Sequence, residues 1–306
     1  MINVRLITIS IFALLLWLLP ATVTAGEGVV ILQSADIIPY DQAAQSILKI
    51  MGEQHTRIIS FSGDMDKGRT IIQSLASSSE MVVAVGPEAT YLLAVTPNQF
   101  KRFFCAVLNP DRILSKGTPY PGVSLNISPE FQLRIIKTML PGRKKVAIIH
   151  SAEKNEHLVA EFQRVASDLG LVIRPFLVNG TSEVPEIPDL PDFDADVLLF
   201  IPDQLVILED VVSLLVKKLL FKGIPVVGFN RWFSQNGAVL SFALDYNELG
   251  SQCGRLARDL LQTGQVPGPL VHPPEKVRLI FNEKVAQRLK VTLPPNVRAK
   301  IDEITP

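Results

Sequence analysis

Short runs of apolar, mostly β-branched residues recur along the chain, and each is followed by a segment with apolar residues at helical spacing. In the first half these runs predict strands at Val29–Gln33, Arg57–Phe61, Met81–Val85 and Arg102–Leu108. The helical faces between them consist of Ala44, Ile47, Leu48 and Met51, and then of Ile71, Ile72 and Leu75. This alternation predicts βα units and parallel sheets.

A second series of the same kind begins at Ser128, an N-cap residue that Pro129 and Glu130 follow in the first helical turn. It predicts helices at 129–140, 151–169 and Leu205–Phe221, and strands at Lys145–His150, Val172–Val178, Asp196–Ile201, Pro225–Asn230 and Ala238–Leu244. A proline-rich connector, Pro185–Pro191, interrupts the series. The strand at Asp196–Ile201 is almost wholly apolar, which is typical of a strand covered by helices on both faces.

The two series predict an α/β protein of two doubly wound, Rossmann-like lobes with parallel sheets. The remaining segments are a helix at Tyr246–Leu261, a strand at Val277–Phe281 and a helix at Glu283–Leu289, too few for a third domain. If that long helix returns to the first lobe and the strand to the second, the chain crosses between the lobes three times and forms a hinge. We therefore expect lobe 1 to hold residues 26–124 and 245–274, and lobe 2 residues 125–244 and 275–306.

The first 25 residues have the pattern of a secretory signal peptide. Arg5 precedes an apolar run, Leu6–Leu19, which Pro20 and the small residues of Ala21–Ala25 follow. Because the run is shorter than the ~20 residues that span a bilayer, cleavage is favoured over an uncleaved anchor. No cysteine follows the run, which argues against a lipid anchor. We expect a periplasmic protein.

Composition narrows the class of partner. The 30 Lys and Arg side chains balance 30 Asp and Glu side chains, so the charge gives no indication of nucleic acid or anionic lipid as a partner. About 280 residues remain after the signal, enough for two domains in a monomer. Cys105 and Cys253 can pair in an oxidising compartment, but the sequence does not place them, so buried free thiols are the default expectation.

Several segments resemble the ABC-transporter substrate-binding proteins of the tryptophan/tyrosine-binding type. The most specific is Gly237–Gly250, with its Asp-Tyr-x-Glu-Leu-Gly tract; the others are Val82–Gly86, Asn109-Pro110, Gly122–Ser124, Ile224–Val226, Ala257, Leu260-Leu261, Pro267, Leu279–Asn282, Ala286, Leu289 and Leu293-Pro294. The resemblance covers essentially the whole mature chain and departs from the family pattern at Phe229–Trp232. It implies the type I periplasmic-binding-protein fold, a small-molecule ligand and transient contact with an ABC permease.

In open α/β sheets, ligands bind beyond the carboxyl ends of the strands, where helix N-termini and loop amides converge. This rule selects Pro39, Tyr40, Gly86, Pro87, Glu88 and Asn109 in the first lobe, and His150, Ser151, Asn155, Pro202, Asp203, Asn230, Arg231 and Trp232 in the second. Each alone is more often a cap or a turn residue, and Tyr40 also fits a hydrophobic staple. We predict a ligand site formed by Tyr40, Gly86, Pro87, Glu88, Asn109, Ser151, Asn155, Asp203, Asn230 and Trp232.

Four positions leave alternatives open. Trp232 and Phe229 offer flat apolar area for a ring or a cation, or they pack at the hinge. Asp203 caps the helix after it or accepts hydrogen bonds from a ligand amine. Asp245 is expected mainly to cap the helix that begins at Tyr246.

Other chemistry has weak support. The segment Gly63–Thr70 mimics a phosphate-binding loop, but Arg69 replaces the required lysine and Asp64 and Asp66 would repel a triphosphate. His150, Glu153 and His157 match no zinc signature, so no metal or cofactor is expected. No Gly-x-Ser-x-Gly, Cys-x-x-Cys, His-Glu-x-x-His or Gly-x-Gly-x-x-Gly motif is present, and no catalytic residue is assigned.

The sequence therefore predicts the extracytoplasmic solute-binding component of an ABC uptake transporter, whose lobes close on a small organic ligand such as an aromatic amino acid. An extracytoplasmic ligand sensor for a signalling partner, with no transport role, is the main alternative. An enzyme built on the same scaffold is the third.

Overall fold

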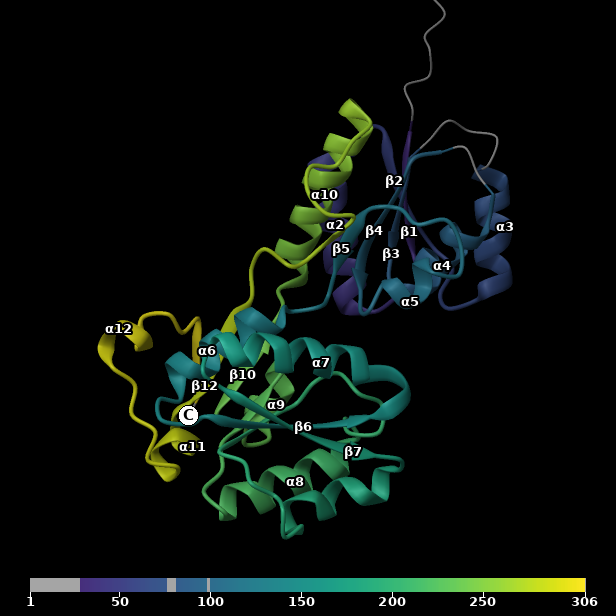
Figure 1. Cartoon of the computed structure of the whole chain (residues 1–306). Helices are drawn as coiled ribbons and strands as arrows, with labels where there is room; N and C mark the ends of the chain where they lie inside the picture. The colour runs from purple at the N-terminus through teal and green to yellow at the C-terminus, as the bar shows by residue number, and fades with distance from the viewer. Residues whose placement is uncertain (1–27, 76–80, 98–99, 306) are drawn as a thin grey trace, which may run out of the picture.

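The computed structural model describes residues 28–75, 81–97 and 100–305, apart from the side chains of residues 153 and 154. The predicted signal peptide lies outside these residues. Within them, the strands form two sheets, each the centre of one lobe (Figure 1). Both lobes are layered α/β structures, as the alternating pattern predicts.

The first lobe is built around a parallel sheet with the strand order β11-β5-β4-β3-β1-β2. Its elements are β1 (Val29–Gln33), α2 (Ile38–Met51), β2 (Thr56–Ser60), α3 (Met65–Leu75), β3 (Met81–Val85), α4 (Pro87–Val95), β4 (Arg102–Val107), α5 (Asp111–Leu114), β5 (Gly122–Ser124), α10 (Tyr246–Thr263) and β11 (Val271–His272). Helices α2 and α10 pack together on one face of the sheet, and α3, α4 and α5 lie on the other (Figure 1).

The second lobe has the strand order β13-β12-β10-β9-β8-β6-β7. Its elements are α6 (Pro129–Met139), β6 (Lys145–Ser151), α7 (Ala152–Asp168), β7 (Val172–Val178), the 3-10 helix η1 (Thr181–Asp189), β8 (Val197–Leu199), α8 (Glu209–Phe221), β9 (Val226–Gly228), α9 (Arg231–Gln235), β10 (Leu240–Ala243), β12 (Arg278–Asn282), α11 (Glu283–Arg288), α12 (Pro295–Arg298) and β13 (Glu303–Thr305). Neighbouring strands of this sheet pair in parallel, with the exception of β10 and β12, which are antiparallel.

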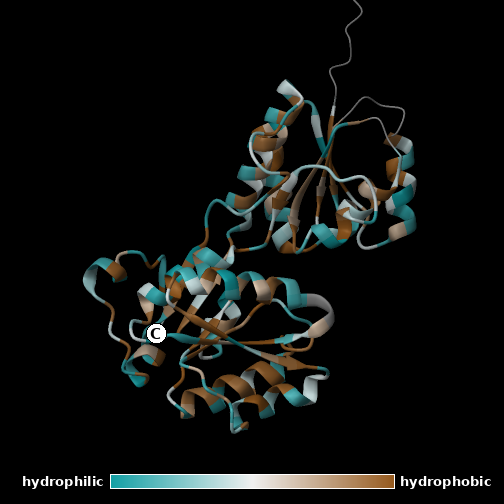
Figure 2. Cartoon of the chain, viewed as in Figure 1, coloured by the Kyte–Doolittle hydropathy of each residue, from teal (hydrophilic) through white to brown (hydrophobic). Residues whose placement is uncertain are grey.

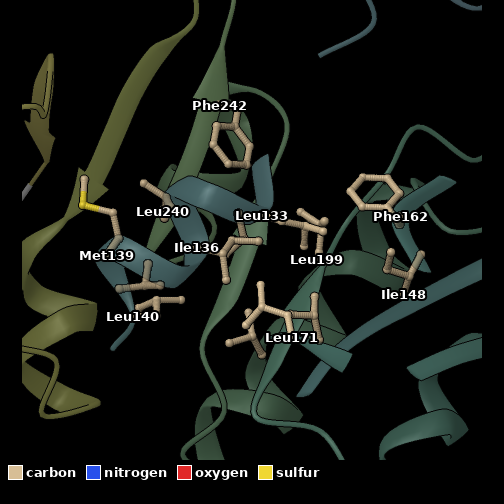
Figure 3. Packing of buried hydrophobic residues seen from close by; sticks show 14 of the residues in the cluster. Leu133, Ile136, Met139, Leu140, Ile148, Phe162, Leu171, Leu199, Leu240 and Phe242 are labelled. Carbon is tan, nitrogen blue, oxygen red and sulfur yellow. The ribbon is translucent and has the colours of Figure 1, made fainter. Parts of the chain in front are cut away.

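The apolar strands have helices over both faces, which explains why they lack an apolar–polar alternation. In β1, Val30 and Leu32 belong to the core beneath α3 and α4, whereas Val29 and Ile31 belong to the core beneath α2 and α10. Figure 2 shows the same arrangement in both lobes, with apolar strands inside and polar helix surfaces outside. In the second lobe, α6 and α7 pack on β6, β8 and β10 through residues such as Ile136 (Figure 3).

The chain passes between the lobes three times. The connections run from β5 to α6, from β10 to α10 and from β11 to β12. Each is short, and two begin a helix at a capped residue: the Ser128 hydroxyl accepts a hydrogen bond from the Phe131 N–H (3.2 Å), and the Asp245 carboxylate accepts from Asn247. The expected three-crossover hinge is present.

The expectation of free thiols is wrong. Cys105 in β4 and Cys253 in α10 form a disulfide, with their Cα atoms 6.0 Å apart. Both residues are fully buried in the core between the sheet and α2. The sequence could not show this, because the two cysteines are 148 positions apart and meet only when α10 returns to the first lobe.

Candidate ligand-binding site

A cavity of about 440 Å³ lies between the two lobes, against the connections that join them. Its walls come from the end of β4, from the first two connections, from α6, α7 and β12, and from the loops after β8 and β9. They are formed by Leu108, Asn109, Leu125, Asn126, Ile127, Gln132, Leu158, Ile201, Pro202, Ile207, Phe229, Asn230, Arg231, Ala243, Leu244, Tyr246, Arg278 and Ile280. Pockets for small organic ligands have volumes of roughly 300–1,000 Å³, so the space suits such a ligand.

The cavity is walled mostly by apolar side chains and by a few polar groups. The polar side chains are three asparagines, one glutamine, one tyrosine and two arginines. No acidic side chain is among the described residues that line it. A wall of this kind binds an apolar body and orients it through a small number of polar contacts.

The first-lobe wall depends on an irregular end of β4. Ala106 has φ 60°, and the pairing of β4 with β5 shifts register between Cys105 and Val107, which is a β-bulge. Asn109 has φ 49°, a left-handed conformation that asparagine tolerates. Its N–H donates to Oδ1 of Asn126 in the first connection (3.0 Å). The bulge and this hydrogen bond together place Asn109 and Asn126 at the cavity.

The second connection, from β10 to α10, forms part of the cavity wall. The carboxylate of Asp245 accepts hydrogen bonds from the N–H groups of Asn247 (2.9 Å) and Glu248 (3.3 Å), so the expected capping role is confirmed. Its neighbours Leu244 and Tyr246 line the cavity. Burial raises the pKa of the Tyr246 phenol, which therefore stays neutral at physiological pH.

Two arginines and one glutamate form a charged cluster in the second lobe. Arg231 in α9 pairs with Glu303 in β13 through both carboxylate oxygens. Arg278, at the start of β12, lies 3.7 Å from the same carboxylate, beyond hydrogen-bonding distance. Both arginines line the cavity, whereas Glu303 is not among its lining residues.

Aromatic rings pack against one another beside α9, and of Phe229, Trp232 and Phe233 only Phe229 lines the cavity. Phe229 lines it and lies 4.8 Å from Phe233, centroid to centroid. Trp232 is half-buried against the core cluster beneath α8 and meets Phe233 edge to face at 5.3 Å. The indole of Trp232 is not among the side chains that line the cavity in this structure.

Asp203 holds together a polar cluster inside the second lobe. Its Oδ2 accepts hydrogen bonds from the N–H and hydroxyl of Ser151 (both 2.8 Å) and from Nδ2 of Asn155 (2.7 Å). Its Oδ1 accepts from the N–H of Leu205 (3.0 Å). Burial raises the pKa of this 3% exposed carboxyl, but the hydrogen bonds outweigh burial, and the net pKa lies below its ordinary value. Asp203 therefore joins the ends of β6 and β8.

The predicted residues of the first lobe gather at the carboxyl edge of its sheet. Gly86, with φ 94°, caps α4, and a Cβ there would lie 2.7 Å from the Ser34 hydroxyl and 2.8 Å from the ring of Tyr40. Pro87 and the exposed Glu88 form the first turn of α4. Burial, then the charge of Glu88, raises the pKa of Tyr40 to about 12. This group flanks the cavity without lining it.

The structure thus divides the predicted site residues into four groups. Asn109 and Asn230 line the cavity. The other predicted residues lie elsewhere: Ser151, Asn155 and Asp203 in the buried polar cluster, Tyr40, Gly86, Pro87 and Glu88 at the edge of lobe 1, and Trp232 beside α9. Their contacts with ligand stay predictions.

Sequence reasoning missed Arg278, Asn126 and Gln132. The rule for strand carboxyl ends could not find Arg278, because β12 is antiparallel and its amino end lies at the ligand-facing edge. Asn126 lies in the first connection and Gln132 on α6, which follows it. For Asn126, the available signal was the predicted crossing before Ser128, since the first connection lines the cavity.

Two weaker motifs have structural explanations. Asp64 accepts hydrogen bonds from the N–H groups of Asp66 and Lys67 (both 3.0 Å), so a carboxylate occupies the start of α3 where a phosphate would bind. Within the described part of the chain, no three His, Cys, Asp or Glu side chains are placed to hold a metal. The side chain of Glu153 lies outside that part.

A cavity walled by two α/β lobes and the connections between them is the geometry of a two-lobed solute-binding protein. A family model described as ABC transporter substrate-binding protein matches residues 62–305. The chain therefore belongs to the ABC transporter substrate-binding protein family. No curated protein matches it.

Solved structures of the type I periplasmic-binding-protein fold are similar to almost the whole chain. An ABC domain from Streptococcus pneumoniae in complex with L-Trp is 21% identical with a TM-score of 0.60, and the match covers 90% of this chain and 100% of that one. A ligand-free, open substrate-binding protein with adhesive properties from Clostridium difficile is 19% identical with a TM-score of 0.74, covering 91% and 99%. A periplasmic ribose ABC transporter protein from Conexibacter woesei is 13% identical with a TM-score of 0.60, covering 87% and 96%. These likenesses show the fold.

None of the helices within the described residues combines the length and apolarity of a membrane span.

Proposed function

We propose that the protein is the extracytoplasmic solute-binding component of an ABC uptake transporter, acting as a monomer that a signal peptide directs to the periplasm. The single observation that carries the proposal is the cavity whose walls come from both lobes and from the first two connections between them. A ligand held there contacts both lobes at once. Membership of the substrate-binding family supports the partner, an ABC permease.

Capture by closure is the mechanism that this geometry favours. A ligand that docks on one lobe adds contacts with the other only when the lobes approach, so it stabilises the closed state. The connections at Leu125–Ile127 and Ala243–Tyr246 form part of the cavity wall. Ligand contact and hinge rotation are therefore coupled in the same residues, and a permease can distinguish the loaded protein from the empty one.

The ligand is a small organic compound with a flat or apolar body, such as an aromatic amino acid or a similar solute. Phe229 and the aliphatic wall supply apolar contact area, and the asparagines at positions 109, 126 and 230 supply hydrogen bonds. The Streptococcus pneumoniae structure, which contains L-Trp, supports this choice of class.

Native mass spectrometry of protein purified without denaturation from the periplasm tests the proposal. We expect a bound compound of low mass, released by denaturation, and a mature chain that begins after the signal segment. Isothermal titration calorimetry of the unfolded and refolded protein with the released compound should give one site per chain. Conversion of that compound into a product during long incubation would contradict the proposal, and so would a cavity variant, Ala243→Trp, that retains full affinity.

A further inference from the structure

The charges around the cavity do not balance. Arg231 and Arg278 line it, and Glu303 is the carboxylate between them. Glu303 is engaged by Arg231 through both oxygens, whereas the contact with Arg278 is 3.7 Å long. Within the described residues, the guanidinium of Arg278 has no hydrogen-bonded partner. The cluster therefore carries one uncompensated positive charge at the wall of the cavity.

The other walls contain no carboxylate that would pair with a ligand cation. No Asp or Glu is among the described residues that line the cavity. The nearest buried carboxylate, Asp203, already accepts four hydrogen bonds from Ser151, Asn155 and Leu205. An ammonium group placed in this cavity would approach the surplus positive charge of the cluster, with no lining carboxylate to offset it.

Arginine is suited to a carboxylate at this place. Its planar guanidinium offers paired N–H donors that match the two oxygens of a carboxylate. The side chains of Arg231 and Arg278 are 50% and 41% exposed, so their remaining donors are accessible from the cavity. Glu303, 21% exposed, acts as a positioning residue that fixes the Arg231 guanidinium.

We propose that the ligand is an apolar organic acid whose carboxylate pairs with Arg278 and completes a set of two guanidiniums and two carboxylates. This deepens the proposed function and rests on it. The apolar walls at Leu125, Ile127 and Ile280 hold the body of the acid. An ammonium group on the ligand is not required for recognition.

The test uses two matched probes that differ in their charged group. 3-Phenylpropionate and 2-phenylethylamine are phenylalanine without its ammonium and without its carboxylate, respectively. We expect isothermal titration calorimetry at pH 7 to detect binding of the acid, and affinity for the amine to be at least roughly tenfold weaker. Equal binding of the amine, or binding of neither probe, overturns the proposal.

Variants test whether the surplus positive charge carries the recognition. Arg278→Met and Arg231→Met each leave one guanidinium for Glu303, so each should weaken binding of 3-phenylpropionate by roughly 10-fold to 100-fold. The double variant Arg231→Met/Glu303→Gln restores the surplus and should recover most of the affinity. If the cluster is merely structural, the double variant should bind no better than Arg231→Met, which overturns the proposal.

Arg298→Met is the matched control, because Arg298 pairs with Glu283 (2.7 Å) and does not line the cavity. It should bind 3-phenylpropionate as the unaltered protein does. Thermal unfolding of every variant identifies any loss of fold. Failure of the charge test leaves the uptake function intact if native mass spectrometry still finds a bound neutral or cationic solute, whereas an empty or ligand-converting protein contradicts the uptake function itself.

Discussion

At the scale of single residues, the sequence could not show which of two roles Asp203 performs. The position after an apolar strand suggested a helix cap or a ligand contact, and the structure shows a carboxylate that joins two strand ends. It caps only the turn at Leu205, and α8 begins at Glu209 rather than at the predicted Leu205. Its partner Ser151 ends β6, and its partner Asn155 lies in α7, the helix that follows β6. They meet Asp203 because β6 and β8 pair in parallel, so that the two strands end at the same edge of the sheet.

Asp203→Asn should destabilise the protein by about 1–3 kcal/mol at pH 7. An amide in place of the carboxylate presents an NH₂ group to at least one set of the donors that the two oxygens now satisfy. Because the folded-state pKa of Asp203 is lowered, the stability that ionisation contributes is present above the unfolded pKa of about 3.9 and is lost as pH falls through the folded pKa. The difference between the two proteins in urea unfolding should therefore shrink below about pH 4. Asp66→Asn, at a side chain 90% exposed, should change stability by less than about 0.5 kcal/mol at either pH.

Gly86→Ala should also destabilise the protein, and a second glycine separates the two causes. Gly86 and Gly52 have nearly the same φ, 94° and 96°, but a Cβ at Gly52 meets nothing within 4 Å. Gly52→Ala should cost only the strain of a positive φ, roughly 1–3 kcal/mol. Gly86→Ala adds the clash with Ser34 and Tyr40, so its unfolding midpoint in urea should be the lower of the two. Equal midpoints would mean that this edge of lobe 1 relaxes freely.

At the scale of elements, the disulfide fastens the returning helix α10 to β4 of the first lobe. Cys253→Ser should lower the free energy of unfolding by about 2–5 kcal/mol, because the bridge closes a long loop in the unfolded chain. Differential scanning calorimetry in the presence and absence of dithiothreitol checks this. The reductant should lower the Tm of the unaltered protein and leave that of the variant unchanged. An effect on both would place the sensitivity elsewhere.

The longer elements could be predicted from sequence because their patterns are local. Strands β1, β3 and β7 have the predicted limits, since each apolar run ends at a turn or a polar residue. Short elements were missed because they have too few residues to show a pattern. Strand β5 has three residues and β11 two, and such lengths carry no period. They exist as strands because β4 provides a partner for β5, and β5 in turn for β11.

The sequence could predict that the candidate site lies at the carboxyl edges of the two sheets, but not which side chains form it. The rule for strand carboxyl ends led to Asn109 and Asn230, which line the cavity. It could not distinguish them from Ser151 and Asn155, which occupy similar positions but turn inward to Asp203. The direction of a side chain at a strand end depends on its tertiary partners, which a single sequence does not contain.

At the scale of the whole molecule, large apolar side chains stand exposed on the facing edges of the two lobes. Ile37 and Ile38 follow β1 and are 44% and 73% exposed, and Leu108 follows β4 at the cavity. On the second lobe, Ile207 and Leu208 follow β8 and are 40% and 50% exposed. These side chains lie at the carboxyl edges of their sheets, the edges that adjoin the cavity. Lobe closure would remove apolar area from water on both sides, beyond the ligand's own contacts.

Ile38→Ser should therefore weaken ligand binding without lowering the stability of the empty protein. If closure buries part of this side chain, the loss is about 1 kcal/mol, or roughly a fivefold weaker affinity. Phe221→Ser is the matched control, because Phe221 is 86% exposed at the far end of α8, which runs away from the cavity edge. Calorimetry with the ligand released from the purified protein measures both affinities. Small-angle X-ray scattering measures the closure itself: the radius of gyration should fall when ligand is added to either variant, with a higher ligand concentration needed for Ile38→Ser. A radius that stays constant at saturating ligand would mean that the lobes bind the solute without moving, and the apolar edges would then need another role.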